Sequence, residues 1–339
     1  MIATYDTVDL FAGPGGLDLG ARAAGLSPVG IEWCSNACAT RRAAGLPTIE
    51  GDVRRYGPAD FMPATRLLGG PPCQTFTVAG DGAGRRALDT VLDLAKRLAA
   101  REGITDRLAG LDDERTGLVL EPLRWILEAV DMGRPYEAIV LEQVQQVQQV
   151  QQVWNAYAEI LRAEGYSVAT GIVRSEWYGV PQTRRRAVLV ARLDGPAVLP
   201  APTHRPYRKG VPQAAGDPGL LPWVSMGEVL PHREPFEVIS NYGTGGDPQN
   251  RGRRSSTEPA ATVTGKIRRN RVVAPDGREL PRFTTAEAGA LQTFPADYPW
   301  SGCDVGQQIG NAVPPLLAAH VVAAAVGVTL PVVELAVAA

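Results

Sequence analysis

The sequence is poor in the residue types that build metal centres and disulfide frameworks. Its 339 residues contain three scattered histidines and four cysteines, none of which forms a CxxC pair. Metal-binding motifs need such residues at short, regular spacings, and disulfide scaffolds need a far higher cysteine content. We therefore expect no metal site and no disulfide framework. The cysteines are Cys34, Cys38, Cys73 and Cys303.

Long apolar runs and an N-terminal signal are also lacking. No apolar run approaches the roughly 18 residues that a helix needs to cross a bilayer. The N-terminus, MIATYDTVDLF, has no basic segment and leads directly into a predicted strand, unlike a secretory signal. With 45% hydrophobic and 21% charged residues, the composition is that of an ordinary globular protein. We expect it in the cytoplasm, without membrane contact.

Positive charge is unevenly spread along the chain. The net charge is −2 and lysine is scarce, so the overall balance does not indicate a nucleic-acid-binding protein. Between Arg251 and Arg271, however, seven basic residues stand against one acid, Glu258, a local charge of +6. Arg184–Arg186 form a second basic cluster. Charge alone leaves open whether these clusters are solvated faces or nucleic-acid contacts.

The order of apolar segments predicts an α/β fold with a doubly wound, mostly parallel sheet. Strand-like and helix-like segments alternate as β-α-β-α-β over about the first 50 residues. Further strands are predicted at RLLGG, YEAIVLE, YSVATGIV and RRAVLVARL, and helices at LVLEPLRWILEAV and WNAYAEILRAEG. The Gly-rich stretch FTVAGDGAGRR predicts a loop.

A change in composition predicts a second, smaller domain. From about Asp194 glycine and proline become dense and helical periodicity disappears, as in DGPAVLPAPTHRPYRKGVPQAAGDPG. We expect residues 1–193 to form the larger domain and residues 194–282 a loop- and strand-rich domain. Residues 283–330 would then be a hinge and a C-terminal helix, IGNAVPPLLAAHVVAAAVG, that returns to the larger domain.

Residues at three successive strand ends favour an adenosine-containing cofactor. The first strand runs into the small-residue turn DLFAGPGG, Asp9–Gly16, before a helix N-terminus. The turn lacks the GxGxxG spacing of dinucleotide sites, which disfavours a nicotinamide dehydrogenase. Glu32 ends the second strand, where a carboxylate can hold ribose hydroxyls. Trp33 can stack on a purine, and Asp52, after the third strand, can accept from an adenine amine.

Cys73 and Glu142 predict nucleophilic chemistry at the same edge. Cys73 follows two prolines at a strand-to-loop corner, GGPPCQ, and a thiolate there would be a good nucleophile. Glu142 ends the strand YEAIVLE, and the carboxyl ends of parallel strands meet at one edge. A nearby carboxylate raises the pKa of a thiol rather than lowering it. Glu142 is therefore expected to act on the substrate and not on Cys73.

These motifs together resemble the C5-cytosine DNA methyltransferases of bacterial type. DLFAGPGG, IEW, GDV, PPCQTF, LEQV, GVPQTRRR, EPAATVT and QQIGNAVP occur in that family's order over nearly all of residues 5–325. The resemblance implies a Rossmann-like methyltransferase domain and a target-recognition domain at residues 194–282. It implies methyl transfer from S-adenosylmethionine to C5 of a flipped-out cytosine in a specific duplex DNA sequence, in a bacterial cytoplasm and associated with the nucleoid.

The resemblance also assigns catalytic residues. Cys73 would add to C6 of the cytosine, Glu142 would bind N3 and the exocyclic amine, and Arg186 would hold O2. Arg184 would support the site and a nearby phosphate. The segment from Gln74 to Arg86 would close over the flipped base, with Gln74 in contact with DNA.

Cofactor and DNA contacts follow from the same resemblance. The residues implied for S-adenosylmethionine are Phe11, Gly13, Gly15, Glu32, Trp33, Asp52, Leu118 and Asn311, although Leu118 could be a core residue and Asn311 a helix cap. Those implied for DNA phosphates are Arg251, Arg253, Arg254, Lys266 and Arg268. The loop NYGTGG, Asn241–Gly246, is either a base-reading loop or a plain surface turn.

Two other functions use the same residues. One is methylation of cytosine in RNA, against which the large second domain speaks. The other is a catalytically weak DNA-binding regulator, against which the presence of Cys73, Glu142 and Arg186 speaks. For the DNA enzyme we expect a monomer, double-stranded DNA as partner, and a cognate restriction endonuclease as a second partner. The recognition sequence itself cannot be deduced.

The sequence departs from the family pattern after Glu142. Gln143 stands where the family has Asn, and three QQV triplets, Gln145–Val153, follow in place of Pro. Valines three residues apart form no stable stripe on an α-helix but would align on a short 3₁₀ turn. We expect a surface loop or an irregular helix extension. The repeat is either a tolerated insertion or a spacer whose length tunes activity.

Deletion of one QQV triplet tests these alternatives. If the repeat is a spacer, its shortening will displace the end of the strand at Glu142 and lower the rate of single-turnover methylation. A variant with an unchanged rate and unchanged cofactor affinity would leave only the tolerated insertion.

Overall fold

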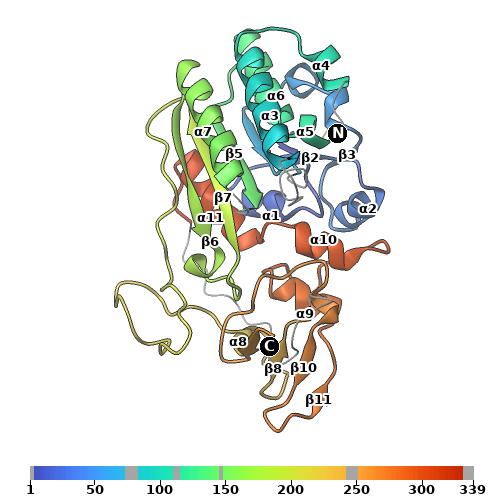
Figure 1. Ribbon diagram of the computed structural model, residues 1–339, viewed down its shortest axis with the longest axis vertical. Helices are drawn as coiled ribbons and strands as arrows, with labels where there is room; N and C mark the ends of the chain where they lie inside the picture. Colours follow the sequence, from blue (N-terminus) through green and yellow to red (C-terminus); the bar gives the residue numbers. More distant parts are fainter. Residues whose placement is uncertain (1–3, 73–82, 110–114, 145–147, 242–250, 331–339) are drawn as a thin grey trace.

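A seven-stranded mixed sheet forms the centre of the larger lobe (Figure 1). The computed structural model describes residues 4–72, 83–109, 115–144, 148–241 and 251–330. The strand order is β3-β2-β1-β4-β5-β7-β6. All pairs up to β5 are parallel, whereas β7 is antiparallel to both neighbours. The strands are β1 (Thr7–Leu10), β2 (Pro28–Glu32), β3 (Thr48–Glu50), β4 (Arg66–Gly69), β5 (Ala138–Val144), β6 (Ser167–Arg174) and β7 (Arg185–Arg192).

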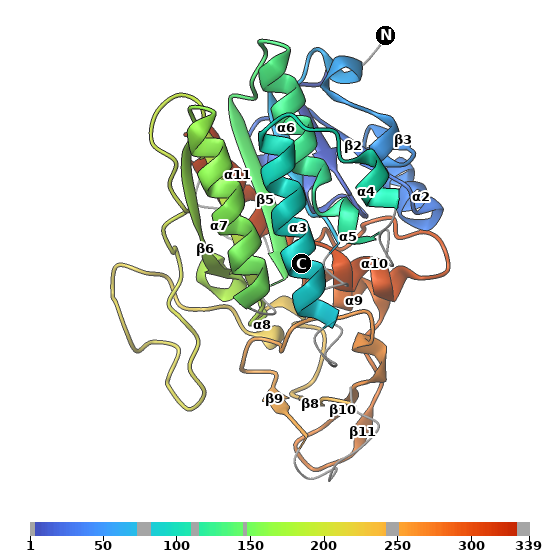
Figure 2. The same cartoon turned by 45° about the horizontal axis from the view of Figure 1, so that its top comes forward.

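Helices cover both faces of this sheet, because the strands are apolar on both sides. In β5, Ile139 and Leu141 face one apolar cluster and Val140 faces the other. The first cluster is completed by α3 (Ala83–Ala99), α6 (Glu121–Asp131) and α7 (Gln148–Ala163), which lie together on one side (Figure 2). The prediction of a doubly wound, mostly parallel α/β fold is confirmed.

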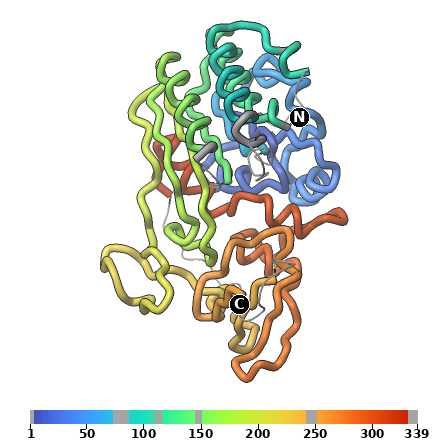
Figure 3. Tube along the Cα trace, in the orientation of Figure 1, coloured from blue at the N-terminus to red at the C-terminus, as the bar shows by residue number. Residues whose placement is uncertain are grey.

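The opposite face is covered by the first helix and by the last helix of the described chain, α1 (Gly16–Ala23) and α11 (Pro315–Val326). In Figure 3 the red tube of α11 lies in the larger lobe, beside the blue N-terminal part of the chain. The two helices approach so closely that a Cβ on Gly20 would lie 2.4 Å from the Cβ of Ala318. This packing places the segment before α11 against the first turn of the fold.

Smaller elements surround the sheet. They are α2 (Ser35–Ala43), η1 (Val53–Arg55), η2 (Pro58–Phe61), α4 (Thr105–Ala109), α5 (Arg115–Leu118) and η4 (Ser175–Tyr178).

Two of the predicted boundaries were wrong. Helix α3 begins at Ala83, inside the stretch predicted as a loop up to Arg86, and α7 begins at Gln148 as a regular α-helix. The last two QQV triplets, residues 148–150 and 151–153, are therefore helical. Val153 and Trp154 are buried against the core.

The smaller lobe has its own antiparallel sheet, of order β11-β10-β8-β9, below the larger lobe in Figure 1. Its elements are α8 (Met226–Val229), β8 (Glu237–Ile239), β9 (Arg253–Ser255), η6 (Ile267–Arg269), β10 (Arg271–Val273), β11 (Glu279–Leu280) and α9 (Thr285–Ala290). Helix α10 (Val305–Asn311) lies between the smaller and the larger lobe in Figure 1. One apolar cluster runs from Met226 through Phe236 and Val272 to Ile309. The side chains of α9 and α10 therefore share the core of the small sheet.

The segment Val305–Val326 corrects the expectation that no apolar run reaches membrane-spanning length. By length and composition alone, it is the one such segment in the described part of the chain. However, 67% of its apolar window is buried inside the protein, and the helix is interrupted between α10 and α11. It is a core element that closes the sheet.

A buried cluster of charged groups lies beneath the first turn. The cluster consists of Arg41, Asp18 and Asp9, and all three side chains are fully buried. Arg41 donates to both carboxylate oxygens of Asp18, at 2.6 and 2.9 Å. Among the described residues no donor reaches either oxygen of Asp9, so an ionised Asp9 would have no hydrogen-bond partner. Burial and the nearby Asp18 raise the pKa of Asp9 well above its ordinary value, and the neutral carboxyl can donate to Asp18.

The raised pKa of Asp9 predicts a pH-dependent stability. Asp has a pKa of about 3.9 in the unfolded chain. Above that pH, and up to its higher folded-state pKa, the folded protein holds one more proton than the unfolded chain. The free energy of unfolding therefore falls as pH rises through this range, by at most about 1.4 kcal/mol per pH unit.

Asp9→Asn keeps a donor toward Asp18 and removes this titration. Thermal or denaturant unfolding from pH 4 to 8 is expected to show a gain in stability over the wild type that grows with pH. Asp297→Asn, an exposed carboxyl, serves as the control and should follow the wild type. Parallel curves for wild type and Asp9→Asn would show that Asp9 is ionised in the fold.

Candidate active site

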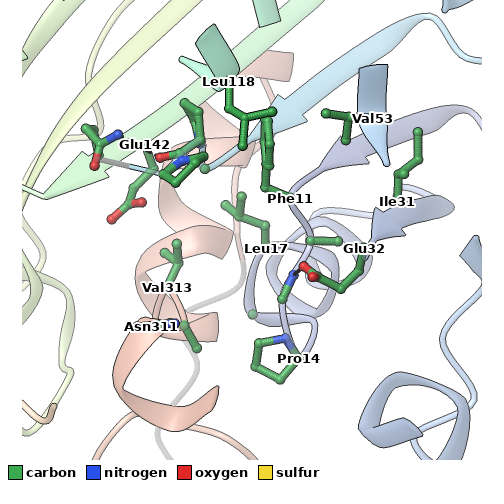
Figure 4. Close-up of a pocket in the computed structure, with 18 of the residues that line it drawn as sticks. Phe11, Pro14, Leu17, Ile31, Glu32, Val53, Leu118, Glu142, Asn311 and Val313 are labelled. Atoms are coloured by element: carbon green, nitrogen blue, oxygen red, sulfur yellow. Dashed lines mark hydrogen bonds between the residues drawn. The ribbon is translucent and has the colours of Figure 1, made fainter. Parts of the chain in front are cut away.

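A cavity of about 630 Å³ opens at the carboxyl ends of β1, β2, β4 and β5. Ligands bind at this edge in open α/β sheets, and the volume suits a small-molecule cofactor. Apolar side chains form its centre, with Glu32 toward one end and Glu142 toward the other (Figure 4). The apolar lining includes Phe11, Leu17, Ile31, Val53, Leu118 and Val313.

The first turn is shaped by the carboxylate that ends β2. Glu32 accepts hydrogen bonds from the backbone N–H groups of Gly13 and Cys34, both at 2.8 Å. Phe11 and Gly13 adopt left-handed backbone conformations, with φ of 59° and 53°. A Cβ on Gly13 would meet no atom within 4 Å, so the backbone is open to a ligand there. Glu32 thus orients the turn as well as lining the cavity.

Gly15 does not line the cavity, in contrast to what the resemblance implied. Its φ of 104° puts it in the left-handed region, and a Cβ would lie 2.2 Å from Leu46. Gly16 does line the cavity, and a Cβ there would lie 2.1 Å from the carbonyl oxygen of Val313. Gly15 is therefore required for the bend of the turn, and Gly16 for its contact with the C-terminal segment.

Trp33, Asp52, Leu118 and Asn311 all line the cavity. The Trp33 side chain is 61% exposed, so its ring is available for stacking. Asp52 accepts from the backbone N–H of Arg54 at 3.0 Å and from its guanidinium at 2.9 Å, which lowers the pKa of the carboxyl. This pair is solvent-accessible, and such pairs contribute little stability, so a ligand donor can take the place of Arg54.

These acceptors and apolar side chains fit the adenosine half of a cofactor. Two carboxylates, Glu32 and Asp52, flank an apolar slot that Phe11 and Leu118 help to form. Carboxylates can accept from ribose hydroxyls and from an exocyclic amine, while the slot buries the purine. Asn311 reaches the cavity from α10, and its Oδ1 accepts from Gln307 at 2.7 Å. In the described part of the chain, no group of three or more metal-ligating side chains occurs.

Glu142 and Arg186 form a buried ion pair at the other end of the cavity. Glu142 lies near the end of β5, and Arg186 lies near the start of β7. Because these strands are antiparallel, Val144 stands opposite Arg186 and the two charged side chains reach the same edge. The Arg186 Nε contacts Glu142 Oε1, and Arg186 Nη1 donates to the carbonyl of Arg185 at 2.7 Å. The pair presents an acceptor and a cation side by side.

Gln143 has a structural role that the sequence did not reveal. Its side-chain nitrogen donates to the carbonyl of Pro71 at 2.7 Å, and its side-chain oxygen accepts from the N–H of Val144 at 2.9 Å. It thereby ties the end of β5 to the Pro71–Pro72 turn, which lines the cavity. Its only signal in the sequence was its position beside Glu142, in place of the family Asn.

Cys73 and Gln74 lie outside the described residues, as does the loop from residue 242 to 246. Of the cysteines that the structure describes, Cys38 is buried, and burial together with Glu32 raises the pKa of its thiol to about 11. Cys38 is thus a small core residue and no nucleophile.

Arg184 is not placed for a phosphate contact, in contrast to what the resemblance implied. Only 1% of it is exposed. Its guanidinium donates to the carbonyls of Val263 and Gly310, at 2.9 and 2.8 Å. Burial and the neighbouring Arg186 lower its pKa well below the ordinary value. A group this deep and so engaged cannot reach a DNA backbone.

The predicted DNA contacts lie on the smaller lobe. Arg253 is exposed and pairs with Glu237 at 2.6 Å, while the guanidinium carbon of Arg254 lies 4.5 Å from the Tyr207 ring centre. Lys266 and Arg268 are exposed at the two sides of Ile267, and Arg251 is partly exposed. The first two side chains are thus partly engaged within the lobe, and the other three remain accessible.

Sequence comparison gives a family. The chain matches the C-5 cytosine-specific DNA methylase family over residues 5–209 and 227–326. The type II methyltransferase M1.HphI of Haemophilus parahaemolyticus is 29% identical over 94% of this chain and 85% of its own. M.AplI of Arthrospira platensis is also 29% identical, over 92% of this chain and 82% of its own.

Solved structures share the fold. A Dnmt2 methyltransferase from S. pombe superposes with a TM-score of 0.62 and 16% identity, over 95% of this chain and 98% of its own. A putative DNA modification methyltransferase from an E. coli prophage gives a TM-score of 0.61 and 18% identity, over 96% and 99%. The fold and the sequence match agree: the chain belongs to the C-5 cytosine-specific DNA methylase family, a family of DNA cytosine-5 methyltransferases that use S-adenosylmethionine.

Proposed function

We propose that this protein methylates C5 of a flipped-out cytosine within a specific sequence of double-stranded DNA. The observation that carries the proposal is the Glu142–Arg186 pair, which faces the cavity beside the Pro71–Pro72 turn that leads into Cys73. S-adenosylmethionine would supply an electrophilic methyl group on its sulfonium. Phe11, Gly13, Glu32, Trp33, Asp52, Leu118 and Asn311 would hold it.

Each polar residue at the Glu142 end of the cavity would have a separate role. The Cys73 thiolate would add to C6 of the cytosine, which makes C5 nucleophilic. Glu142 would hold N3 and the exocyclic amine and favour a proton at N3 as negative charge develops, while Arg186 would hold O2. After C5 has accepted the methyl group and lost its proton, the bond between Cys73 and C6 would break.

The smaller lobe would read the DNA. Residues 194–282 would be the target-recognition domain, and residues 283–330 would link it back to the domain formed by residues 1–193. Lys266, Arg268 and Arg251 are accessible cations for phosphates, which would give affinity but no sequence information. The relatives are type II methyltransferases, so we propose a bacterial restriction-modification context, with a cognate endonuclease as partner and a monomer acting in the cytoplasm.

Cys73→Ser and Glu142→Gln test the chemistry. With DNA that carries 5-fluorocytosine, the wild type is expected to form a covalent adduct and Cys73→Ser none. Glu142→Gln should lower the methylation rate by about 10²–10⁴-fold, the usual contribution of a positioned acid–base group. Glu137→Gln is the matched control, because Glu137 is an exposed carboxyl just before the opposite end of β5.

Tritium transfer to duplex DNA and to RNA, followed by bisulfite sequencing, would identify the polymer and the recognition site. Binding of DNA without an adduct would overturn the enzymatic proposal. Labelling of RNA alone would overturn the proposed substrate.

A further inference from the structure

The interface between the two lobes runs along the segment that leads into β7. The backbone of Pro181–Thr183 lies beside Ala260 of the smaller lobe. The N–H of Ala260 donates to the carbonyl of Pro181, and the N–H of Thr183 donates to the carbonyl of Ala260, both at 2.8 Å. The strand that carries Arg186 therefore begins as part of the contact between the lobes.

Gln182 extends this contact through a fully buried side chain. Its Oε1 accepts from the N–H of Val263 at 3.0 Å, and its Nε2 donates to the carbonyl of Leu291 at 2.9 Å and to Gln292 Oε1 at 2.6 Å. Gln292 in turn donates to the carbonyl of Ile309 at 2.6 Å. One side chain thus connects the start of β7 to the smaller lobe and, through Gln292, to α10.

Arg184 makes the same connection a second time. It donates to the carbonyl of Val263, in the smaller lobe, and to that of Gly310, in α10. Among the described residues, no carboxylate forms an ion pair with it. Two backbone carbonyls therefore hold this buried cation, and a shift of either segment would leave it poorly solvated.

The segments that Arg184 joins are also closely packed. A Cβ on Gly310 would lie 2.1 Å from the backbone nitrogen of Gly265. A Cβ on Gly265 would lie 2.4 Å from the side-chain oxygen of Gln307. Because backbone meets backbone here, the smaller lobe and α10 have little room to move independently.

Each end of this hydrogen-bond network lies next to a residue of the proposed active site. Arg186 follows Arg184 by two residues and contacts Glu142, and Asn311 follows Gly310 directly and lines the cavity. We propose that Arg184, together with Gln182, is a positioning residue that sets Arg186 and Asn311 in place relative to the DNA-reading lobe. This inference rests on the proposed methyltransferase function. A positioning role would affect kcat and cofactor affinity, whereas a phosphate contact would affect the affinity for DNA.

Arg184→Lys tests the inference, because a single ammonium cannot span both carbonyls in the geometry of a guanidinium. We expect kcat to fall by about 10–100-fold and the Kd for S-adenosylmethionine, measured without DNA, to rise several-fold. The KM for DNA and the slope of DNA affinity against salt should stay as in the wild type. Gln182→Met, which breaks the parallel connection, should show the same pattern if Arg184→Lys does not fold.

Arg101→Lys is the matched control, because Arg101 bridges Asp131 and Glu164 away from the cavity. It should retain the wild-type kcat and cofactor affinity whatever stability it loses. A folded Arg184→Lys with wild-type kcat would overturn the inference. So would a change confined to the KM for DNA and a salt slope smaller by about one, which would mark a phosphate contact. A wild type that binds no S-adenosylmethionine would instead refute the proposed function.

Discussion

The antiparallel pairing of β7 with β5 is the constraint on which the Glu142 end of the cavity depends. In a wholly parallel sheet, only residues at the carboxyl ends of strands reach the ligand-binding edge. Because β7 runs the other way, its first residues arrive at that edge, and Arg186 meets Glu142. The same reversal brings the Gln182–Arg184 segment to the boundary with the smaller lobe. The Glu142–Arg186 pair and the contact between the lobes thus both depend on the direction of one strand.

Burial of charge shows how the fold holds this arrangement. Arg41 is paired with the Asp18 carboxylate, Arg186 with Glu142, and Arg184 with two backbone carbonyls. Removing a charge from water is costly unless it is paired and hydrogen-bonded. Each arginine therefore favours the conformation in which its partners are present. All three sets lie beside the cavity or beneath its first turn, so they oppose distortion of the cavity.

Much of the fold and part of the cavity lining could be predicted from short-range patterns. Alternating strand and helix signals correctly predicted the α/β sheet, because each signal depends on a few neighbouring residues. Glu32, Asp52 and Glu142 were predicted to share an edge from the geometry of parallel strands alone, and all three line the cavity. The start of α3 was missed because glycines weaken the local helix signal. The start of α7 was missed because the three-residue spacing of the valines outweighed the good helix propensity of glutamine.

Residue identity by itself determined the chemistry that this protein can offer: a small-residue turn, carboxylates at strand ends, and a thiol after two prolines. Only the tertiary structure decided what surrounds each of two similar residues. Gly15 and Gly16 are adjacent, yet one faces Leu46 and the other Val313 and the cavity. Arg184 and Arg186 stand two apart in one motif, yet one is a buried link and the other faces Glu142. The reason is physical: a local pattern sets backbone conformation, whereas the partner of a side chain can come from a distant segment, as Gly310 does for Arg184, 126 residues away along the chain.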